Sequence, residues 1–198
     1  MTQATRPDTW DKSSRTLLTI KSKAGVARHF RTSIVSTDKS GGTKDFDVIY
    51  NYAEGCLKKH GDVTPVELTF EGYATEVGTE TAGTEGLGFD DLMNTADASQ
   101  PLSISLDNTR TDYCVVFEKT TSTSATDAMA ATATGDRAIR STFKNGNFTD
   151  VASSDTDGVL KYTLKYKVAP FQRDGTANVI FESSDGTGTV VLPVITYT

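Results

Sequence analysis

The side chains that most often carry out enzyme chemistry are scarce in this sequence. It has two histidines, His29 and His60. His29 lies between Arg28 and Phe30 in an apparent strand, and His60 ends a short lysine run, so neither is next to a nucleophile motif such as G-x-S-x-G. Two carboxylates brought together by folding can form an acid–base site, but no spacing indicates one. We therefore expect a protein that is not an enzyme.

Motifs for metals, nucleotides and redox chemistry are missing as well. Cys56 and Cys114 lie far apart and match no metal or redox spacing, which predicts two reduced, partly buried thiols. The run GTEGLG at 83–88 departs from the dinucleotide and P-loop patterns. The run DTDG at 155–158 lacks the further ligands and the closing glutamate of a calcium loop, so it predicts a turn. We expect no cofactor and no metal.

Charged residues alternate with apolar residues in two segments. Residues 159–168 (VLKYTLKYKV) place lysines on one face, and residues 65–72 (PVELTFEG) place glutamates on one face. This period of two predicts half-buried strands. Opposite charges on neighbouring strands contribute roughly 0.2 to 1 kcal/mol per pair, so we expect these strands to pair in an antiparallel sheet. The charged residues are Lys161, Lys165, Lys167, Glu67 and Glu71.

The composition indicates one β-rich domain. The 198 residues suffice to bury a normal core without metals or disulfides. Hydrophobic residues make up only 36%, while there are 32 threonines and 16 glycines, which are typical of half-exposed strands and turns. The net charge of −6 argues against a protein that binds nucleic acid through a basic surface, but not against one that lets nucleic acid pass.

Signals for secretion or membrane insertion are not found. The first thirty residues are charged throughout and contain no apolar run of about 7 to 15 residues, so no signal peptide is predicted. The longest apolar stretches are the length of a strand, well short of the roughly 20 residues that a membrane-spanning helix needs. We expect no membrane partner.

The hydrophobic pattern predicts nine or ten strands and little helix. Residues 1–14 form an N-terminal arm with a single Trp10, which either contacts another molecule or covers the edge of its own domain. Residues 15–198 form one β domain. A short helix is predicted at 89–93. The expected strands are 15–21, 26–35, 46–52, 65–72, 101–106, 113–119, 138–148, 159–168, 178–182 and 189–197.

Polar, glycine-rich segments predict loops between these strands. They include 36–44, with its glycine pair, and 74–88, rich in Thr, Glu and Gly. The low-complexity segment 120–134 predicts a loop with a possible helical turn. Asn145 and Gly146 form the dipeptide most typical of a hairpin turn, so we expect the strand 138–148 to end there.

Three stretches of the chain resemble the major tail tube proteins of tailed viruses, and those of archaeal viruses in particular. They are VELTFEGYATEVGT at 66–79, PLSISLDNTRTDYCVVFEKT at 101–120 and DGVLKYTLKYKVAPFQRDGTANVIFESSDGTG at 157–188. The resemblance covers most of the chain from about Asp47 onward. It lies in the phrasing and order of the strands, without a catalytic signature.

This resemblance implies a fold, a function and partners. The implied fold is all-β dominated, a β-sandwich or barrel of the tail tube type with a short flanking helix and long loops. Six copies would close into a ring, and rings would stack into the tube that conducts the genome into the host. The implied partners are further copies of the chain, a tape-measure protein, a tail terminator and viral DNA passing through the lumen without specific binding. The location would be the virion tail, assembled in the host cytoplasm.

The resemblance also gives the charged residues possible roles. Glu67 and Glu71 either face the lumen or pair with the lysines on the outer face of the sheet. The segments 120–134 and 74–88 exceed a minimal tube protein, and they indicate either outward decoration or a different virion protein. The residues expected at contacts between subunits are Trp10, Lys39, Lys44, Lys161, Lys165 and Lys167.

An alternative function is a decoration protein of the virion or a β-sandwich module that binds a receptor or a glycan. It predicts a stable monomer or trimer. Glycan sites usually expose aromatic side chains in a pocket, whereas most aromatic residues here alternate toward the core. The sequence therefore favours the tube protein.

Overall fold

The fold is built from antiparallel β-strands. A computed structural model describes residues 15–23, 28–31, 34–51, 55–73, 111–156, 158–187 and 190–197. Its ten strands confirm the all-β prediction. The predicted helix at 89–93, the predicted strand at 101–106, the loop 74–88 and the N-terminal arm with Trp10 lie outside these residues. The strands are β1 (Arg15–Ser22), β2 (Arg28–Arg31), β3 (Ile34–Gly41), β4 (Phe46–Asn51), β5 (Gly55–His60), β6 (Val66–Tyr73), β7 (Tyr113–Thr120), β8 (Arg137–Thr156), β9 (Val159–Val168) and β10 (Val179–Asp185).

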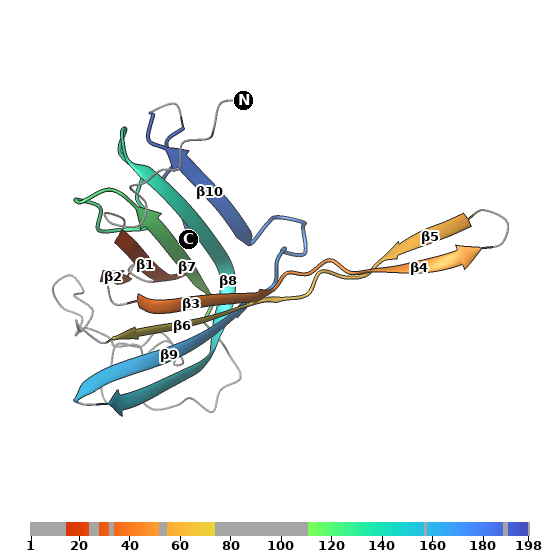
Figure 1. The fold of residues 1–198 in the computed structure, drawn as a ribbon, viewed down its shortest axis with the longest axis horizontal. Helices are drawn as coiled ribbons and strands as arrows, with labels where there is room; N and C mark the ends of the chain where they lie inside the picture. The colour runs from red at the N-terminus through yellow and green to blue at the C-terminus, as the bar shows by residue number, and fades with distance from the viewer. Residues whose placement is uncertain are drawn as a thin grey trace, which may run out of the picture.

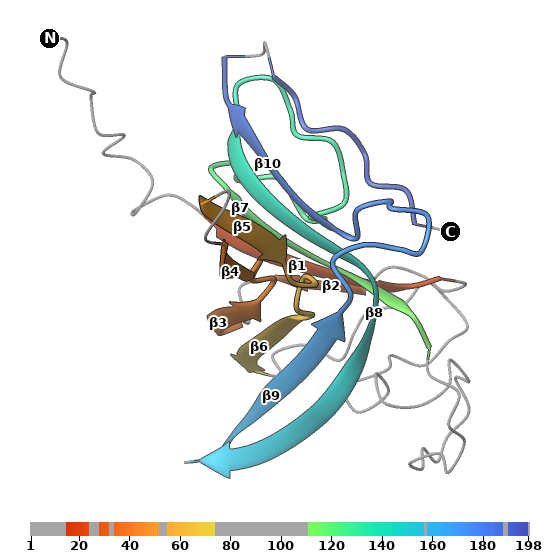
Figure 2. The same cartoon turned by 90° about the vertical axis from the view of Figure 1, so that its right-hand side faces the viewer.

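Eight of the strands form one curled sheet around the long strand β8. The order is β2-β1-β7-β8-β9-β6-β3, and β10 also pairs with β8, while β4 and β5 form a separate two-stranded sheet. The first half of β8 pairs with β7 and β10, and its second half pairs with β9. The first half-sheet consists of β2, β1, β7, β10 and the first half of β8. The second half-sheet consists of the second half of β8 with β9, β6 and β3. Figures 1 and 2 show how β8 curves from one to the other, which gives the molecule the form of a half-barrel.

The main core lies between the two half-sheets. Strict alternation in β6 and β9 turns Phe70, Leu164 and Tyr166 inward, where they are fully buried against Phe148. The rings of Phe70 and Phe148 meet edge to face, with centroids 6.2 Å apart, a geometry that adds to the stabilisation from burial. The Tyr166 hydroxyl donates a hydrogen bond to the carbonyl oxygen of Tyr113 at 2.7 Å, so its polar atom is satisfied inside the core.

The Asn145-Gly146 dipeptide does not form the predicted turn, because β8 runs through it to Thr156. Asn145 has a φ of 57°, and two residues of β8, Lys144 and Asn145, oppose the single residue Cys114 of β7. This is a β-bulge, which bends a strand and increases its twist. A Cβ at Gly146 would clash with the ring of Tyr166. The local turn signal therefore produces a bend at the point where β8 passes between the half-sheets.

Three further predictions about elements were wrong. The segment 36–44 is not a loop throughout, because β3 pairs with β6 as far as Gly41, opposite Val66. The predicted strand 26–35 is divided between β2 and β3. The C-terminal segment 190–197 belongs to no strand. The amide of Ile195 donates instead to the carbonyl oxygen of Met129 at 2.9 Å, so the 120–134 segment takes the hydrogen bonds that a sheet would otherwise make.

The segment 120–134 is a loop, as predicted, and it packs on the outer face of the first half-sheet. Its residues Ala128 and Met129 join Leu17, Val116 and Tyr197 in a second buried cluster. This loop therefore covers apolar surface of the sheet, and whether it also decorates the outside of an assembly stays a prediction. Within the described residues no helix is long and apolar enough to cross a membrane.

Cys114 is a buried, reduced thiol in the second cluster, as predicted. Burial raises the pKa of its thiol to about 12, because an apolar environment disfavours the thiolate. The side chain of Cys56 lies outside the described residues. Cys114 is therefore unsuited to thiolate chemistry.

Candidate functional site

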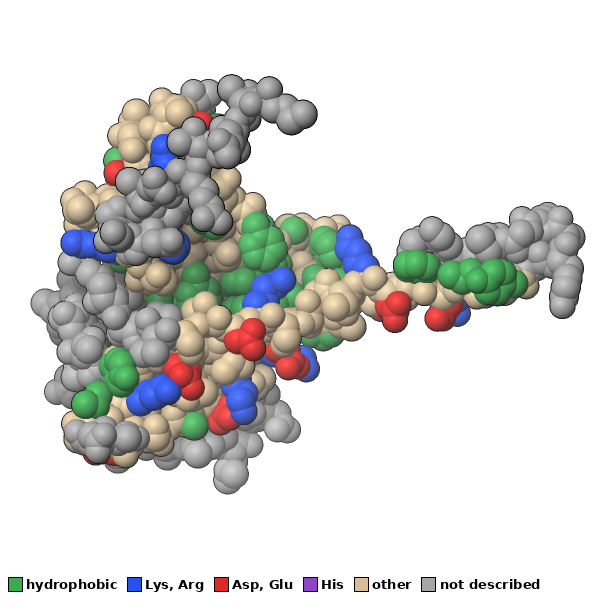
Figure 3. All heavy atoms as spheres, in the orientation of Figure 1, with side chains coloured by type: hydrophobic (Ala, Val, Ile, Leu, Met, Phe, Trp, Pro, Cys, Tyr) green, Lys and Arg blue, Asp and Glu red, His purple; other side chains and the backbone are tan. Residues whose placement is uncertain are grey.

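A charged strip covers the outer face of the second half-sheet. We define it as Glu67, Glu71, Asp150, Lys161, Lys165 and Lys167. Figure 3 shows acidic and basic side chains next to one another along this part of the surface. The pairs are Lys167 with Glu67 at 2.6 Å, Lys161 with Glu71 at 2.7 Å and Lys165 with Asp150 at 2.9 Å.

The strip confirms the predicted pairing of the two charged strands. Glu67 lies directly opposite Lys167 in the β6–β9 register. The hydrogen bond from Lys161, and then its positive charge, lower the pKa of the Glu71 carboxyl, so this residue stays ionised. The pairing of Lys165 with Asp150 on β8 was not predicted. The lumen-facing and intersubunit roles of these residues stay predictions, because an ion pair on a free surface fits either.

A hairpin projects from the body of the protein. We call β4 and β5 the projecting hairpin; their register runs from Phe46 opposite His60 to Asn51 opposite Gly55. Figure 1 shows it extending well beyond the curled sheet. Phe46, Val48 and Tyr50 are 48%, 38% and 84% exposed, and Figure 3 shows hydrophobic side chains along one side of the hairpin.

The base of the projecting hairpin is held by hydrogen bonds that continue the β3–β6 pairing. The hydroxyls of Thr43 and Thr64 are 2.8 Å apart, and the amide of Thr64 donates to the carbonyl oxygen of Thr43 at 3.2 Å. Gly41 adopts a φ of +79°, and a Cβ there would clash with the carbonyl oxygen of Pro65. The glycine pair that indicated a loop therefore allows the β3–β6 pair to continue directly into the projecting hairpin. Lys44 lies exposed in this base.

Isolated two-stranded hairpins are at best marginally stable in water. The projecting hairpin also carries an apolar row, Phe46, Val48 and Tyr50, which is exposed in the single chain. Contiguous exposed apolar surface marks sites of interaction. The hairpin therefore has the properties of a surface that gains stability when another molecule covers it.

A shallow groove lies between the edge strand β3 and the strand β10. It has a volume of about 130 Å³, and Leu68, Phe117 and Phe143 contribute apolar side chains to it. Phe181 on β10 is 59% exposed at the groove, and the Nζ atom of Lys39 lies 5.2 Å from the centroid of its ring. This is a cation–π distance. The predicted contact residue Lys39 is thus held over an aromatic ring.

Unpaired strand edges border the curled sheet. In the part of the chain that the structure describes, β2 and β3 end the strand order, and β10 pairs with β8 alone. A free edge presents unpaired amide and carbonyl groups and can accept a strand of another chain. Sequence patterns could not locate these edges, because they depend on the strand order.

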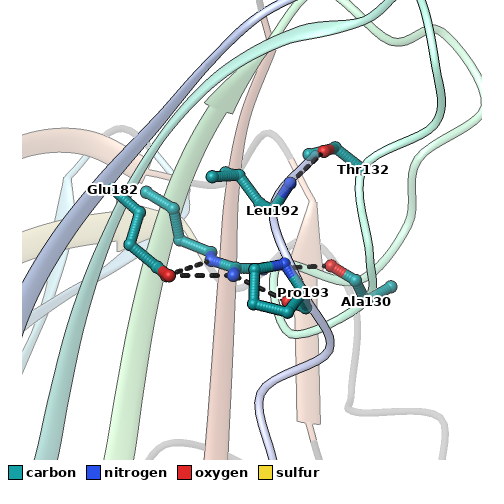
Figure 4. Close-up of polar contacts among 6 residues, drawn as sticks. Ala130, Thr132, Glu182, Leu192 and Pro193 are labelled. Atoms are coloured by element: carbon teal, nitrogen blue, oxygen red, sulfur yellow. Dashed lines mark hydrogen bonds and ion pairs between the residues drawn. The ribbon is translucent and has the colours of Figure 1, made fainter. Parts of the chain in front are cut away.

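Sequence reasoning missed a buried arginine, Arg140, that fastens the outer layer to the sheet. Its side chain is fully buried, and its Nη2 atom lies 2.9 Å from Oε2 of Glu182. The guanidinium also donates to the carbonyl oxygens of Ala130 at 3.1 Å and Pro193 at 2.7 Å. Figure 4 shows these acceptors gathered from β10, the 120–134 loop and the C-terminal segment. The only available signal was its place between Ala138 and Thr142 on one face of β8.

No protein-family model matches the chain, and no curated protein sequence matches it. Its fold is similar to a chain in the cryo-EM structure of the PVC sheath/tube terminator of an extracellular contractile injection system, in the extended state. That similarity has a TM-score of 0.45 and 15% identity, and covers 85% of this chain and 93% of the other.

The PVC sheath–tube complex in the extended state gives a TM-score of 0.44 and 14% identity, covering 86% of this chain and 89% of the other. The tube-terminating cap of the anti-feeding prophage gives a TM-score of 0.42 and 12% identity, covering 84% and 88%. These three structures come from an extracellular contractile injection system and from the anti-feeding prophage.

Proposed function

We propose that this chain is a structural, self-assembling protein of a tail-like tube. Copies join side by side through their sheet edges into rings, and the rings stack into a hollow conduit. The observation that carries the proposal is the projecting hairpin, whose apolar side chains Val48 and Tyr50 are 38% and 84% exposed. The proposal assigns no catalysis to the chain.

The open sheet supports the association of copies side by side. The edges of β2, β3 and β10 offer backbone groups that a neighbouring copy can pair with. Closure of such a sheet across several copies removes the edges altogether. From the resemblance of the sequence to tail tube proteins of archaeal viruses, we infer that each ring contains six copies.

The projecting hairpin supports contacts beyond the nearest edge. Its six-residue strands span about 20 Å at roughly 3.3 Å per residue. Full burial of a Val or Phe side chain contributes about 1.5 to 3 kcal/mol relative to exposure, so covering Phe46, Val48 and Tyr50 is a substantial gain. A neighbouring copy in the same ring or the next ring is the partner we infer.

The charge of the molecule suits a conduit for DNA. With a net charge of −6, a tube of many copies repels the phosphate backbone and lets it slide without specific binding. The proposed place is the tail of a virion assembled in the host cytoplasm. The further partners inferred from the resemblance are a tape-measure protein and a tail terminator.

The proposal is tested with the purified chain and the double variant V48S/Y50S. We expect rings or tubes of the unaltered chain in negative-stain electron microscopy, and multiples of the monomer mass in light scattering. V48S/Y50S should stay monomeric with an unchanged circular dichroism spectrum. The control F171S removes an aromatic side chain that is 47% exposed outside the projecting hairpin, and it should assemble.

Two results would contradict this function. One is an unaltered chain that stays a monodisperse monomer across salt and protein concentration. The other is a V48S/Y50S variant that forms rings as readily as the unaltered chain, because the hairpin would then have no part in assembly.

A further inference from the structure

A second polar feature, separate from the edges and the hairpin, is a cavity under the loop that follows β7. Its volume is about 230 Å³, and it lies between β7 and residues 120–136. Three acidic and five hydroxyl side chains line it, and the remaining lining residues are alanines. The acidic residues are Glu118, Asp127 and Asp136, and the hydroxyl residues are Thr120, Ser122, Ser124, Thr126 and Thr132.

Glu118 is the unusual member of this lining. It is only 2% exposed, and its Oε2 atom has no hydrogen-bond partner among the residues that the structure describes. Arg140 lies directly opposite on β8, but its guanidinium bonds to Glu182, Ala130 and Pro193. A buried carboxylate oxygen without a partner is costly. The structure therefore leaves an unsatisfied acceptor at the wall of an acidic cavity.

The surroundings of Glu118 carry negative charge. Burial raises the pKa of its carboxyl to about 7, and the charges of Asp127 and Asp136 add to that rise, while Arg140 opposes it. Among the described residues that line the cavity there is no lysine, arginine or histidine. A cation inside the cavity would relieve the repulsion between these carboxylates.

The lining also indicates the kind of cation. Carboxylate and hydroxyl oxygens suit hard cations such as Mg²⁺. Aromatic side chains, which recognise organic ammonium groups, are missing from the described part of this lining. Among the described residues no three His, Cys, Asp or Glu side chains are grouped closely enough to hold a metal ion directly. The ion must therefore keep much of its water, as Mg²⁺ usually does.

The cavity has the room and the fixed groups for such an ion. Its volume admits several water molecules at about 30 Å³ each. The Oδ1 atom of Asp127 accepts hydrogen bonds from the Thr19 hydroxyl at 2.9 Å and the Met129 amide at 2.8 Å, so this carboxylate is held in place. We propose that the cavity binds a hydrated divalent cation of the Mg²⁺ type, anchored by the Glu118 carboxylate and held through water by Asp127 and Asp136.

The bound ion would fasten the 120–136 loop to the sheet in addition to the bond from Arg140 to Ala130. The experiment measures the melting temperature of the full chain against MgCl₂ concentration at constant ionic strength, with titration calorimetry on the same samples. A ligand that binds only the folded state raises the melting temperature by mass action. We expect a saturable rise for the unaltered chain and none for E118Q.

The control D174N removes the same charge from an exposed aspartate in the loop between β9 and β10, and it should respond as the unaltered chain does. D136N keeps Glu118 and should weaken Mg²⁺ binding about tenfold or more, as loss of an outer ligand does. It serves as the test if E118Q does not fold.

The outcomes separate clearly. A chain whose melting temperature does not respond saturably to MgCl₂ overturns the proposal, as does E118Q or D136N with unweakened binding. Equal weakening in D174N and E118Q would show screening of overall negative charge, which also overturns it. Loss of binding in E118Q and D136N, or in D136N alone if E118Q does not fold, with retention in D174N supports the site.

Discussion

At the scale of residues, Glu118 makes the stability of the protein depend on pH. Its pKa is about 7 in the folded chain, against an ordinary value of 4.5. Between these values the folded state holds a proton that the unfolded state has lost, so the free energy of unfolding falls as pH rises from about 4.5 to 7 and then levels off. Each unit of pKa difference corresponds to about 1.4 kcal/mol. The difference between the two pKa values therefore sets the upper limit of the loss in the free energy of unfolding.

This prediction is checked by urea denaturation at pH 5 and pH 8, with EDTA present so that divalent ions play no part. The unaltered chain should lose more stability than E118Q between the two pH values, because glutamine does not titrate. An equal loss in both chains would assign the pH dependence to other groups.

Some side-chain contacts were predictable and others were not. The alternation in 65–72 and 159–168 predicted that the two strands pair, because period two places every second charged residue on one face, while the register that sets Glu67 opposite Lys167 came from the structure. Arg140 could not be predicted to be buried, because its acceptors come from Ala130, Glu182 and Pro193, far apart in the sequence. Such a site exists only after the loop and the C-terminal segment have packed on the sheet.

At the scale of elements, Gly41 controls how β3 passes into the projecting hairpin. We predict that G41A destabilises the chain more than G175A does. Both glycines have positive φ, +79° and +86°, so both substitutions carry the cost of a left-handed alanine, about 1 kcal/mol. Only at Gly41 would the added Cβ clash with the Pro65 carbonyl oxygen, while Gly175 has no atom within 4 Å.

Urea denaturation of the two variants measures this difference, and amide hydrogen exchange in β4 and β5 locates it. G41A should show faster exchange in the projecting hairpin, whereas G175A should not. Equal destabilisation by both substitutions would mean that the ribbon shifts to make room for the Cβ.

Whether a strand could be predicted from the sequence depended on whether its own residues or distant partners determined its structure. β6 and β9 were predicted because their alternation matches their burial. β3 was missed in 36–41 because its polar residues look like a loop, although β6 supplies a partner for the backbone. The C-terminal segment 190–197 has the composition of a strand, yet it bonds to Met129 and Thr132. Partners distant in the sequence decided both cases.

At the scale of the whole molecule, we expect substitutions in the charged strip to affect assembly without affecting folding. Reversing Lys161, Lys165 and Lys167 to glutamate should leave the single chain folded, because exposed ion pairs are worth about 0 to 1 kcal/mol each. It should impair tube formation if the strip lies between copies. Circular dichroism measures the first effect, and negative-stain electron microscopy measures the second.

A matched variant also changes Glu67, Glu71 and Asp150 to lysine, so the ion pairs return with opposite polarity and the net charge is unchanged. Assembly restored by this swap would show that the strip needs only its internal pairs. Assembly still lost would assign the lysines a contact with another copy. If the variant with all three lysines changed to glutamate assembled normally, the charged strip would not be part of the interface between copies.

The bulge at Asn145 and Gly146 has a geometric consequence for any ring of copies. On each side of the bulge, about ten residues of β8 pair with the strands of one half-sheet. At about 3.3 Å per residue, each of these two parts of β8 is roughly 33 Å long. A change of a few degrees in the backbone at this dipeptide therefore displaces the far end of a half-sheet by ångströms. In a closed ring, the radius would then be set by the torsion angles of two residues inside each copy, as much as by the contacts between copies.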